Sequence, residues 1–296
     1  MRPRLDAGLR RLGLRTGEPS GPSPREPPGR SPGEPPPDLD RLVLDPAARR
    51  IVDRTLPFTM TGVPRLHALV DAVRYCVKRE LPGAFAECGV WRGGSVMAML
   101  LTPRDLGVED RDVYLYDTFE GMTQPTEHDV SAIEPAALAT WSESGARGER
   151  PWAQLFSGEV YDEQAVRRNV LSTGYPSERV HFVRGPVEET IPATAPGRLA
   201  LLRLDTDWYE STRHELVHRD PRRADGGVLI LDDYGHWEGA RLACEEYFGS
   251  LAAPVLLSRV DSYQSVSSLR RASRPGAVAG IVSSTGPRTK WTRSDG

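Results

Sequence analysis

The middle of the chain alternates between short apolar runs and stretches whose apolar residues recur at helical spacing. Apolar residues recur at intervals of three and four in Val63–Val77 and again in Ala240–Leu251, which predicts helices. The apolar runs predict strands at Ala84–Cys88, Val113–Tyr116, Val180–Val183, Leu199–Leu204, Val228–Leu231 and Val255–Val260. Such alternation is typical of a parallel sheet covered on both faces. The pattern therefore predicts an α/β fold with a doubly wound, mostly parallel sheet.

Polar residues indicate where several helices begin. We expect Thr61 to cap the helix that has Pro64 in its first turn, and Asp162 to cap the helix that carries Val166. Thr212 and Glu215 have the spacing of a capping box, which predicts a helix that follows them.

The two ends of the chain differ in composition from this middle part. Residues 15–38 contain no aliphatic or aromatic side chain, and Ser, Arg, Gly and Pro dominate beyond residue 262. We therefore expect a disordered Pro/Gly/Arg-rich tail over 1–38, one domain over 39–262, and a weakly structured segment over 263–296 in which only Ala277–Val282 resembles a strand. A proline-rich ligand for a partner domain is the alternative interpretation of the tail.

Composition and charge exclude several classes of protein. The chain has 39% hydrophobic and 27% charged residues, which are globular values, and its net charge of −3 gives no positive field for nucleic acid or an anionic membrane. No apolar run approaches the roughly 18 residues that span a bilayer, and the N-terminal residues lack the apolar stretch expected of a signal peptide. We expect a cytoplasmic protein without nucleic-acid or membrane partners. Three cysteines without CxxC spacing argue against a disulfide scaffold and a structural zinc site.

Acidic residues follow most of the predicted strands. They are Glu87, Asp117, Asp205, Asp207, Asp232 and Asp233. Ligands bind beyond the carboxyl ends of such strands, and burying several like charges there without a counter-ion is costly. A divalent cation would resolve that conflict, and all-oxygen ligands favour Mg²⁺, Mn²⁺ or Ca²⁺ over Zn²⁺. The alternative is that one or two of these aspartates cap helices, as Asp207 could do near Ser211.

The first predicted strand runs into a glycine-rich turn, Gly89–Ser95. Glycines let the backbone approach a ligand closely, and the following helix start offers free N–H groups to an anion. The spacing fits neither the dinucleotide fingerprint nor a phosphate loop. Asp117, after the next strand, can accept the hydroxyls of a ribose. Together these features indicate a nucleoside that bears a carboxylate, as S-adenosylmethionine does; a tight turn without a ligand is the alternative.

Four motifs carry a resemblance to a known family. In this order, Ala86–Ser95, Tyr116–Met122, Leu204–Thr212 and Leu231–Gly235 resemble the macrocin O-methyltransferase family. Its members are Mg²⁺- and S-adenosylmethionine-dependent enzymes that methylate sugar hydroxyls on macrolide and aminocoumarin antibiotics. The resemblance implies a Rossmann-like class I methyltransferase fold, a small-molecule acceptor such as a glycosylated natural product, and a homo-oligomer.

The resemblance also implies roles for individual residues. It implies that the metal ligands are Asp205, Asp232 and Asp233, and that Asp207 is the general base, with His236 as the competing candidate. The cofactor-binding residues that it implies are Met60, Glu87, Gly89, Ser95, Asp117 and Glu188.

Two segments depart from the family's pattern, and one insertion calls for an interpretation. The charged run His218–Asp225 stands where the family is expected to be apolar, which would loosen packing ahead of the metal-binding strand. The serine-rich Tyr263–Leu269 stands in place of an aromatic last strand. The polar insertion between Gly121 and Gly158 is interpreted as an acceptor lid, with a surface loop that has no function as the alternative.

Two other functions compete with methyl transfer. Asp205-Thr-Asp207 also matches the DxD motif of metal-dependent glycosyltransferases, which bind a nucleotide-sugar diphosphate. A methyltransferase-like fold kept as a non-catalytic binding or scaffold module is the second alternative.

Overall fold

The protein is described by a computed structural model over residues 44–156, 161–252, 254–261 and 266–267. Its sheet has the strand order β3-β2-β1-β4-β5-β7-β6. The first five strands pair in parallel, and they are β1 Ala84–Cys88, β2 Val113–Asp117, β3 Val180–Arg184, β4 Leu199–Leu204 and β5 Arg223–Leu231. The strand order reverses between β1 and β4. Ligands of open α/β sheets bind at such a switch point, so the topology places the site there.

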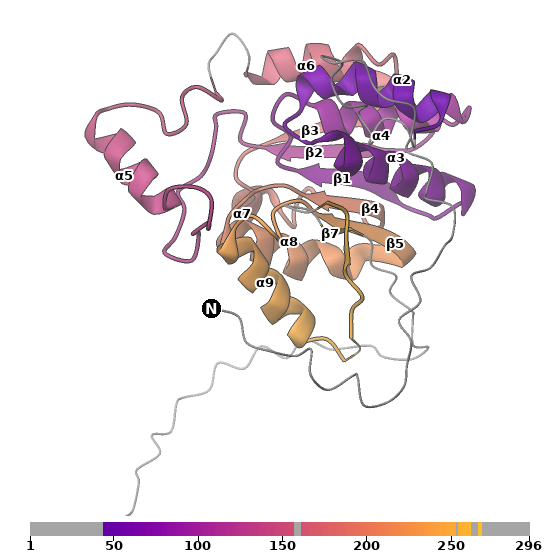
Figure 1. The fold of residues 1–296 in the computed structure, drawn as a ribbon. Coiled ribbons are helices and arrows are strands. Elements are labelled where there is room, and N and C mark those ends of the chain that lie inside the picture. The colour runs from indigo at the N-terminus through magenta and orange to yellow at the C-terminus, as the bar shows by residue number, and fades with distance from the viewer. Residues whose placement is uncertain (1–43, 157–160, 253, 262–265, 268–296) are drawn as a thin grey trace, which may run out of the picture. The chain divides into compact units, whose positions relative to one another are not determined.

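Helices cover both faces of this sheet (Figure 1). One face carries α2 Pro46–Thr55, α3 Val63–Lys78, α4 Gly94–Asp105 and α6 Glu163–Leu171. The other face carries α7 Val187–Thr190, α8 Tyr209–Arg219 and α9 Glu238–Gly249. Because both faces are covered, β1 and β4 are buried along their whole lengths. The α/β, doubly wound, mostly parallel architecture predicted from the sequence is confirmed.

The last predicted strand differs most from the structure. Val255–Val260 forms only the two-residue β6 Ser258–Arg259, which pairs antiparallel with β7 Val266–Ser267. Both residues of β6 are exposed, so this edge has little apolar surface to extend it. The strand character of Ala277–Val282 lies outside the described residues.

The helix starts agree with the sequence in one case out of three. Asp162 does cap α6, accepting a hydrogen bond from the Ala165 N–H at 2.6 Å. The Thr61 prediction is wrong by one residue, because Gly62 is the N-cap of α3. The capping-box prediction is also wrong: α8 begins at Tyr209, so Thr212 and Glu215 lie inside the helix.

The charged run ahead of β5 does not leave the packing loose. Asp220 and Arg223 are both buried and form an ion pair, with Arg223 Nε 2.7 Å from Asp220 Oδ1. The Tyr247 hydroxyl donates to the other Asp220 oxygen at 2.9 Å. The Arg219 guanidinium lies 4.0 Å from the centre of the Tyr116 ring. Paired charges and a cation–π contact thus occupy the space that the resemblance assigns to apolar side chains.

The domain boundaries predicted from composition stay predictions. The tail 1–38, and the segment 263–296 apart from β7, lie outside the described residues. Among the helices of the described part, none combines the length and apolarity needed to cross a membrane.

Candidate active site

A cleft of about 390 Å³ opens at the carboxyl ends of the parallel strands. Nearly all of the site residues expected from the sequence line it. They are Met60, Gly89, Ser95, Asp117, Glu188, Asp205, Asp207, Asp232 and Asp233. Glu87 is the exception: its side chain is 1% exposed, and it is not part of the cleft wall. Its place beside the cofactor stays a prediction; in the structure Glu87 is still part of the regular strand β1, and its side chain lies in the interior.

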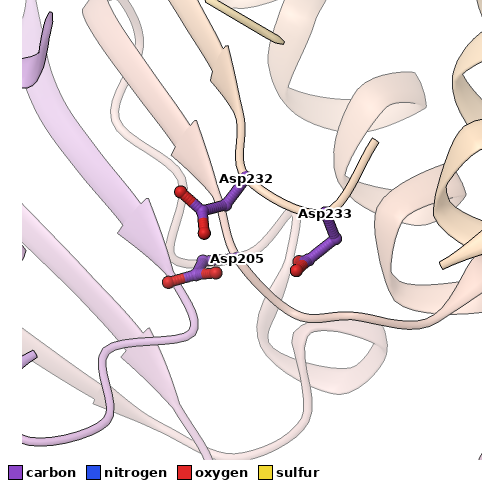
Figure 2. Close-up of side chains that lie close together, drawn as sticks. All are labelled: Asp205, Asp232 and Asp233. Atoms are coloured by element: carbon purple, nitrogen blue, oxygen red, sulfur yellow. The ribbon is translucent and has the colours of Figure 1, made fainter. Parts of the chain in front are cut away.

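Three aspartates converge on one side of the cleft (Figure 2). Asp205 follows β4, and Asp232 and Asp233 follow β5. One carboxylate oxygen from each lies within 4.8 Å of the others. Neighbouring residues of a strand point to opposite faces, but β5 ends at Leu231, and the chain turns there. That turn lets both Asp232 and Asp233 face the same point.

Arg203 is a buried counter-ion for these carboxylates. It lies within β4, is 1% exposed, and donates to Asp205 Oδ2 at 2.6 Å and to Asp232 Oδ1 at 2.7 Å. It also donates to Glu87 Oε1 and, at 3.0 Å, to the Thr61 hydroxyl. The chain therefore supplies one cation of its own to this acidic cluster.

Arg65 supplies a second positive charge from the first turn of α3. Its Nη1 lies 2.6 Å from Asp232 Oδ2, and its Nε lies 3.2 Å from Asp261 Oδ2. Both oxygens of Asp232 thus accept from arginines, and the helix that follows the N-terminal segment is tied to the aspartate cluster.

The two arginines do not balance all of the acidic groups. Burial raises the pKa of Glu87 to about 8 and that of Asp205 to about 7, and Arg203, which contacts both carboxyls, offsets this only in part. Burial also acts on Asp232, but Arg203 and Arg65 outweigh it and lower the pKa of that group. Burial and the neighbouring carboxylates raise the pKa of Asp233 well above its usual range. Without a further cation, burial therefore favours the protonated forms of Glu87, Asp205 and Asp233.

The donor set fits a hard divalent cation. The converging atoms are all carboxylate oxygens, which Mg²⁺ and Mn²⁺ prefer, and neither a cysteine nor a histidine belongs to the group. A cation would replace the protons that burial otherwise forces onto Asp205 and Asp233. Asp205, Asp232 and Asp233 are the residues that could hold it.

Asp207 lies next to this group in a conformation that is unusual for an aspartate. Its φ is +67°, and its N–H donates to Asp233 Oδ2 at 3.1 Å. The Trp237 indole N–H donates to Asp207 Oδ1 at 2.9 Å. Burial, followed by the Asp205 carboxylate, raises the pKa of Asp207 well above its usual range. Trp208 is the N-cap residue of α8, so the alternative in which Asp207 caps that helix is not what the structure shows.

The glycine turn packs directly against the loop that follows β4. Gly89 has a φ of +80°, and a Cβ placed there would lie 1.8 Å from the Asp205 carbonyl oxygen. A Cβ on Gly94 would likewise lie 2.7 Å from the Phe58 backbone. Both glycines therefore allow close approach of backbone to backbone, and only Gly89 also lines the cleft.

Asp117 organises the opposite end of the cleft. Its Oδ2 accepts from the Val90 N–H at 2.7 Å and from the Trp91 N–H at 3.2 Å. Its Oδ1 accepts from the Phe119 N–H at 2.7 Å and from the Tyr161 hydroxyl. Asp117 therefore stabilises the glycine turn and also lines the cleft. The Tyr161 hydroxyl is one of the groups that donate to its carboxylate.

The insertion between Gly121 and Gly158 is anchored to the cleft. Where described, it contains α5 Ala137–Ala146 and contributes Met122, Glu134 and Trp152 to the cleft wall. Asp129 is fully buried, and its carboxylate accepts from the Tyr209 N–H at the start of α8, at 2.7 Å. The insertion is therefore packed against the site, as a lid would be.

Several residues of the site escaped the sequence analysis. Arg203, Arg65 and Trp237 were not singled out, although a lone arginine inside the apolar run Leu199–Leu204 is a signal that could have identified the first. A buried charge in a central strand needs partners, and the only candidates at its level are the acidic strand ends. His236, the competing base, lies 3.1 Å from Glu134 Oε1 through its Nε2.

Comparison with known proteins identifies a family over most of the chain. The macrocin-O-methyltransferase (TylF) family matches residues 47–266. The 8-demethyl-8-(2,3-dimethoxy-alpha-L-rhamnosyl)-tetracenomycin-C 4'-O-methyltransferase of Streptomyces olivaceus is 34% identical over 219 residues, which are 72% of this chain and 77% of that protein. The demethyldecarbamoylnovobiocin O-methyltransferase of Streptomyces niveus is 34% identical over 191 residues, which are 64% of this chain and 67% of that protein.

Solved structures show the same similarity. The O-methyltransferase NovP is 30% identical with a TM-score of 0.60, covering 73% of this chain and 83% of its own. The calicheamicin methyltransferase CalS11 is 22% identical with a TM-score of 0.51, covering 81% of this chain and 99% of its own, which shows a shared fold. These matches favour methyl transfer over the glycosyltransferase and scaffold alternatives.

Proposed function

The chain belongs to the macrocin O-methyltransferase family and is an S-adenosylmethionine-dependent O-methyltransferase; from that premise, we propose that it methylates one hydroxyl of a vicinal diol with the help of Mg²⁺. The acceptor that we propose is a deoxysugar on a glycosylated natural product, in keeping with a relative named for methylating a rhamnosyl group. The observation that carries the proposal is the convergence of Asp205, Asp232 and Asp233 in one cleft.

Some residues of this cleft would bind the cofactor, and others would bind the acceptor. Ser95 in the first turn of α4, together with the free N–H groups there, would take the carboxylate of the cofactor, and Asp117 its ribose. Glu188, on α7, would lie beside the adenine, and Met60, which is 58% exposed, would cover the cofactor from the N-terminal segment. These assignments orient the methyl donor toward the aspartates.

Asp207 is proposed as the general base. A bound Mg²⁺ supplies Lewis-acid polarisation that lowers the pKa of a sugar hydroxyl. Asp207 lines the same cleft as Asp205, Asp232 and Asp233, which makes it the candidate proton acceptor there. Its Oδ1 already accepts from Trp237, so the proton would go to Oδ2. His236 is the weaker candidate, since the Glu134 carboxylate holds its Nε2.

The insertion is proposed as the acceptor lid. Met122 and Trp152 supply apolar surface at the cleft, next to the buried Trp208 and Trp237. The apolar faces of a sugar pack well against such surface, while Glu134 offers an acceptor to a hydroxyl. We also expect a cytoplasmic homo-oligomer without nucleic-acid or membrane partners, as the sequence and the resemblance imply.

The test is methyl transfer from labelled S-adenosylmethionine to a panel of glycosylated natural products, with and without EDTA. We expect transfer to diol-bearing sugars that EDTA abolishes and that Mg²⁺ or Mn²⁺ restores. Calorimetry with S-adenosylhomocysteine in the presence of EDTA is the control, because the cofactor end of the cleft does not contain the aspartate cluster. Transfer that continues in EDTA would contradict the metal, and transfer only to acceptors without a diol would contradict the substrate class.

A further inference from the structure

The short segment Asp205–Thr206–Asp207, named here the aspartate turn, has to be held in place by its surroundings. Asp207 adopts the left-handed region at φ +67°. That region is sterically unfavourable for a residue with a Cβ, although aspartate tolerates it better than most. The turn places Asp205 and Asp207 in the same cleft, so contacts that stabilise it also fix the two carboxylates relative to each other.

On the side of the cleft, the contacts of the turn come from residues of the site itself. The Asp207 N–H donates to Asp233 Oδ2 at 3.1 Å, and the Trp237 indole donates to Asp207 Oδ1 at 2.9 Å. Asp233 is also one of the three residues that could hold a cation, so its carboxylate does not serve the backbone of Asp207 alone.

On the opposite side, the turn is held by a residue outside the cleft. The Thr206 hydroxyl donates to both carboxyl oxygens of Glu215, at 3.1 and 3.2 Å. Glu215 lies in α8, is fully buried, and does not line the cleft. Burial raises the pKa of Glu215 well above its usual value.

We propose that Thr206 and Glu215 form a positioning pair that fixes the aspartate turn and so directs the Asp207 carboxylate toward the acceptor. The importance of this direction for turnover rests on the proposed function, in which Asp207 is the base. The positioning itself does not, because it concerns the conformation of Asp207 in the free protein.

A purely structural role would be served at least as well by apolar side chains. A buried hydrogen bond contributes little net stability, and replacing both partners with apolar groups of similar shape is nearly neutral. The neighbouring Leu216 is a fully buried apolar side chain of the same helix. What the hydrogen bond adds is direction, because it restricts the χ1 angle of Thr206 and thereby the backbone on both sides of it.

The indole proton of Trp237 reports on this positioning directly. The chain has 6 tryptophans, so ¹⁵N-labelled tryptophan gives a small set of indole signals, and Trp237→Phe identifies the one that donates to Asp207. In Thr206→Val, which keeps the shape and removes the hydroxyl, we expect this signal to move toward that of an indole without a carboxylate acceptor and to exchange faster. Thr206→Ser keeps the hydroxyl and should retain the wild-type signal. An unchanged signal in Thr206→Val would overturn the proposal.

A double variant separates positioning from stability. In Thr206→Val/Glu215→Met we expect the melting temperature of Glu215→Met alone, because the buried Cys88 thiol and Arg219 guanidinium lose Glu215 in both variants, and the Trp237 signal should stay displaced. Mn²⁺ affinity, measured by titration of the metal alone, should fall about tenfold, as is typical when a supporting residue behind a metal ligand is lost. A wild-type Trp237 signal in the double variant would overturn the proposal. If wild-type protein binds no Mn²⁺, the proposed function fails while the Trp237 result still decides the positioning.

Discussion

Replacing Arg203 with methionine removes the central counter-ion of the site while keeping a side chain of similar length. Arg203 is 1% exposed and contacts Glu87, Asp205 and Asp232 together. After the substitution, Arg65 still pairs with Asp232, but Glu87 and Asp205 lose the arginine that contacts both of them. The change therefore leaves buried negative charge that has no cation beside it.

The size of the effect follows from that geometry. Removing one partner of a buried ion pair typically costs about 3–5 kcal/mol, because the other charge stays buried. The carboxyls can limit this cost by binding protons, and each unit of pKa shift corresponds to about 1.4 kcal/mol. In the folded wild type the pKa of Glu87 is about 8 and that of Asp205 about 7, and loss of Arg203 raises both further above their unfolded values. The destabilisation is therefore smallest at low pH and grows as the pH rises.

Urea unfolding followed by tryptophan fluorescence at about pH 5 and about pH 8 measures how the destabilisation by Arg203→Met depends on pH. We expect Arg203→Met to lose on the order of 3–5 kcal/mol at the higher pH and distinctly less at the lower pH. Arg203→Lys keeps the charge but not the planar guanidinium. Its free energy of unfolding should lie between those of Arg203→Met and the wild type. A loss below about 1 kcal/mol that does not change with pH would refute the interpretation of Arg203 as the counter-ion.

Three further substitutions test other parts of the site. The folded-state pKa of Glu87 is raised from 4.5 to about 8, so the unfolding free energy of the wild type should fall as the pH rises between these values; Glu87→Gln should flatten that slope in urea titrations. Asp207→Asn should bind S-adenosylhomocysteine normally in calorimetry and lose turnover roughly 10²–10⁴-fold, whereas normal turnover would remove it as the base. Asp129→Ala removes the group that accepts the Tyr209 N–H, so we expect about 1 kcal/mol of destabilisation and a higher acceptor KM, with cofactor affinity unchanged.

The parallel strands were predictable because their signal is local. The runs that became β1 and β4 match the structure residue for residue, since a buried strand needs apolar side chains on both faces. The starts of α3 and α8 were less predictable. Thr61 and Glu215 have the sequence positions of capping residues. In the fold, the Thr61 hydroxyl accepts a hydrogen bond from Arg203, and the Glu215 carboxyl accepts one from Thr206. Spacing along the chain does not show which of two possible partners a polar side chain will meet.

The residues of the candidate site were likewise only partly predictable from the sequence. The aspartates after β4 and β5 were predictable, because the carboxyl ends of parallel strands share one edge of the sheet. Glu87 was assigned to the cofactor, yet it turns inward to Arg203 because it is still within β1. The insertion could be recognised as a departure from periodicity, but its anchoring through Asp129 depends on where the start of α8 lies in space.

By itself, the order of apolar and acidic residues determined the α/β class, the family and the edge of the sheet that carries the site. These are properties of period, composition and motif order, which are all local along the chain. Only the tertiary structure decided how the charges are balanced, because Arg203 and Arg65 reach their carboxylates across strands and helices that are far apart in sequence. Electrostatic energy depends on distance and burial in space, and neither can be read from the order of the residues.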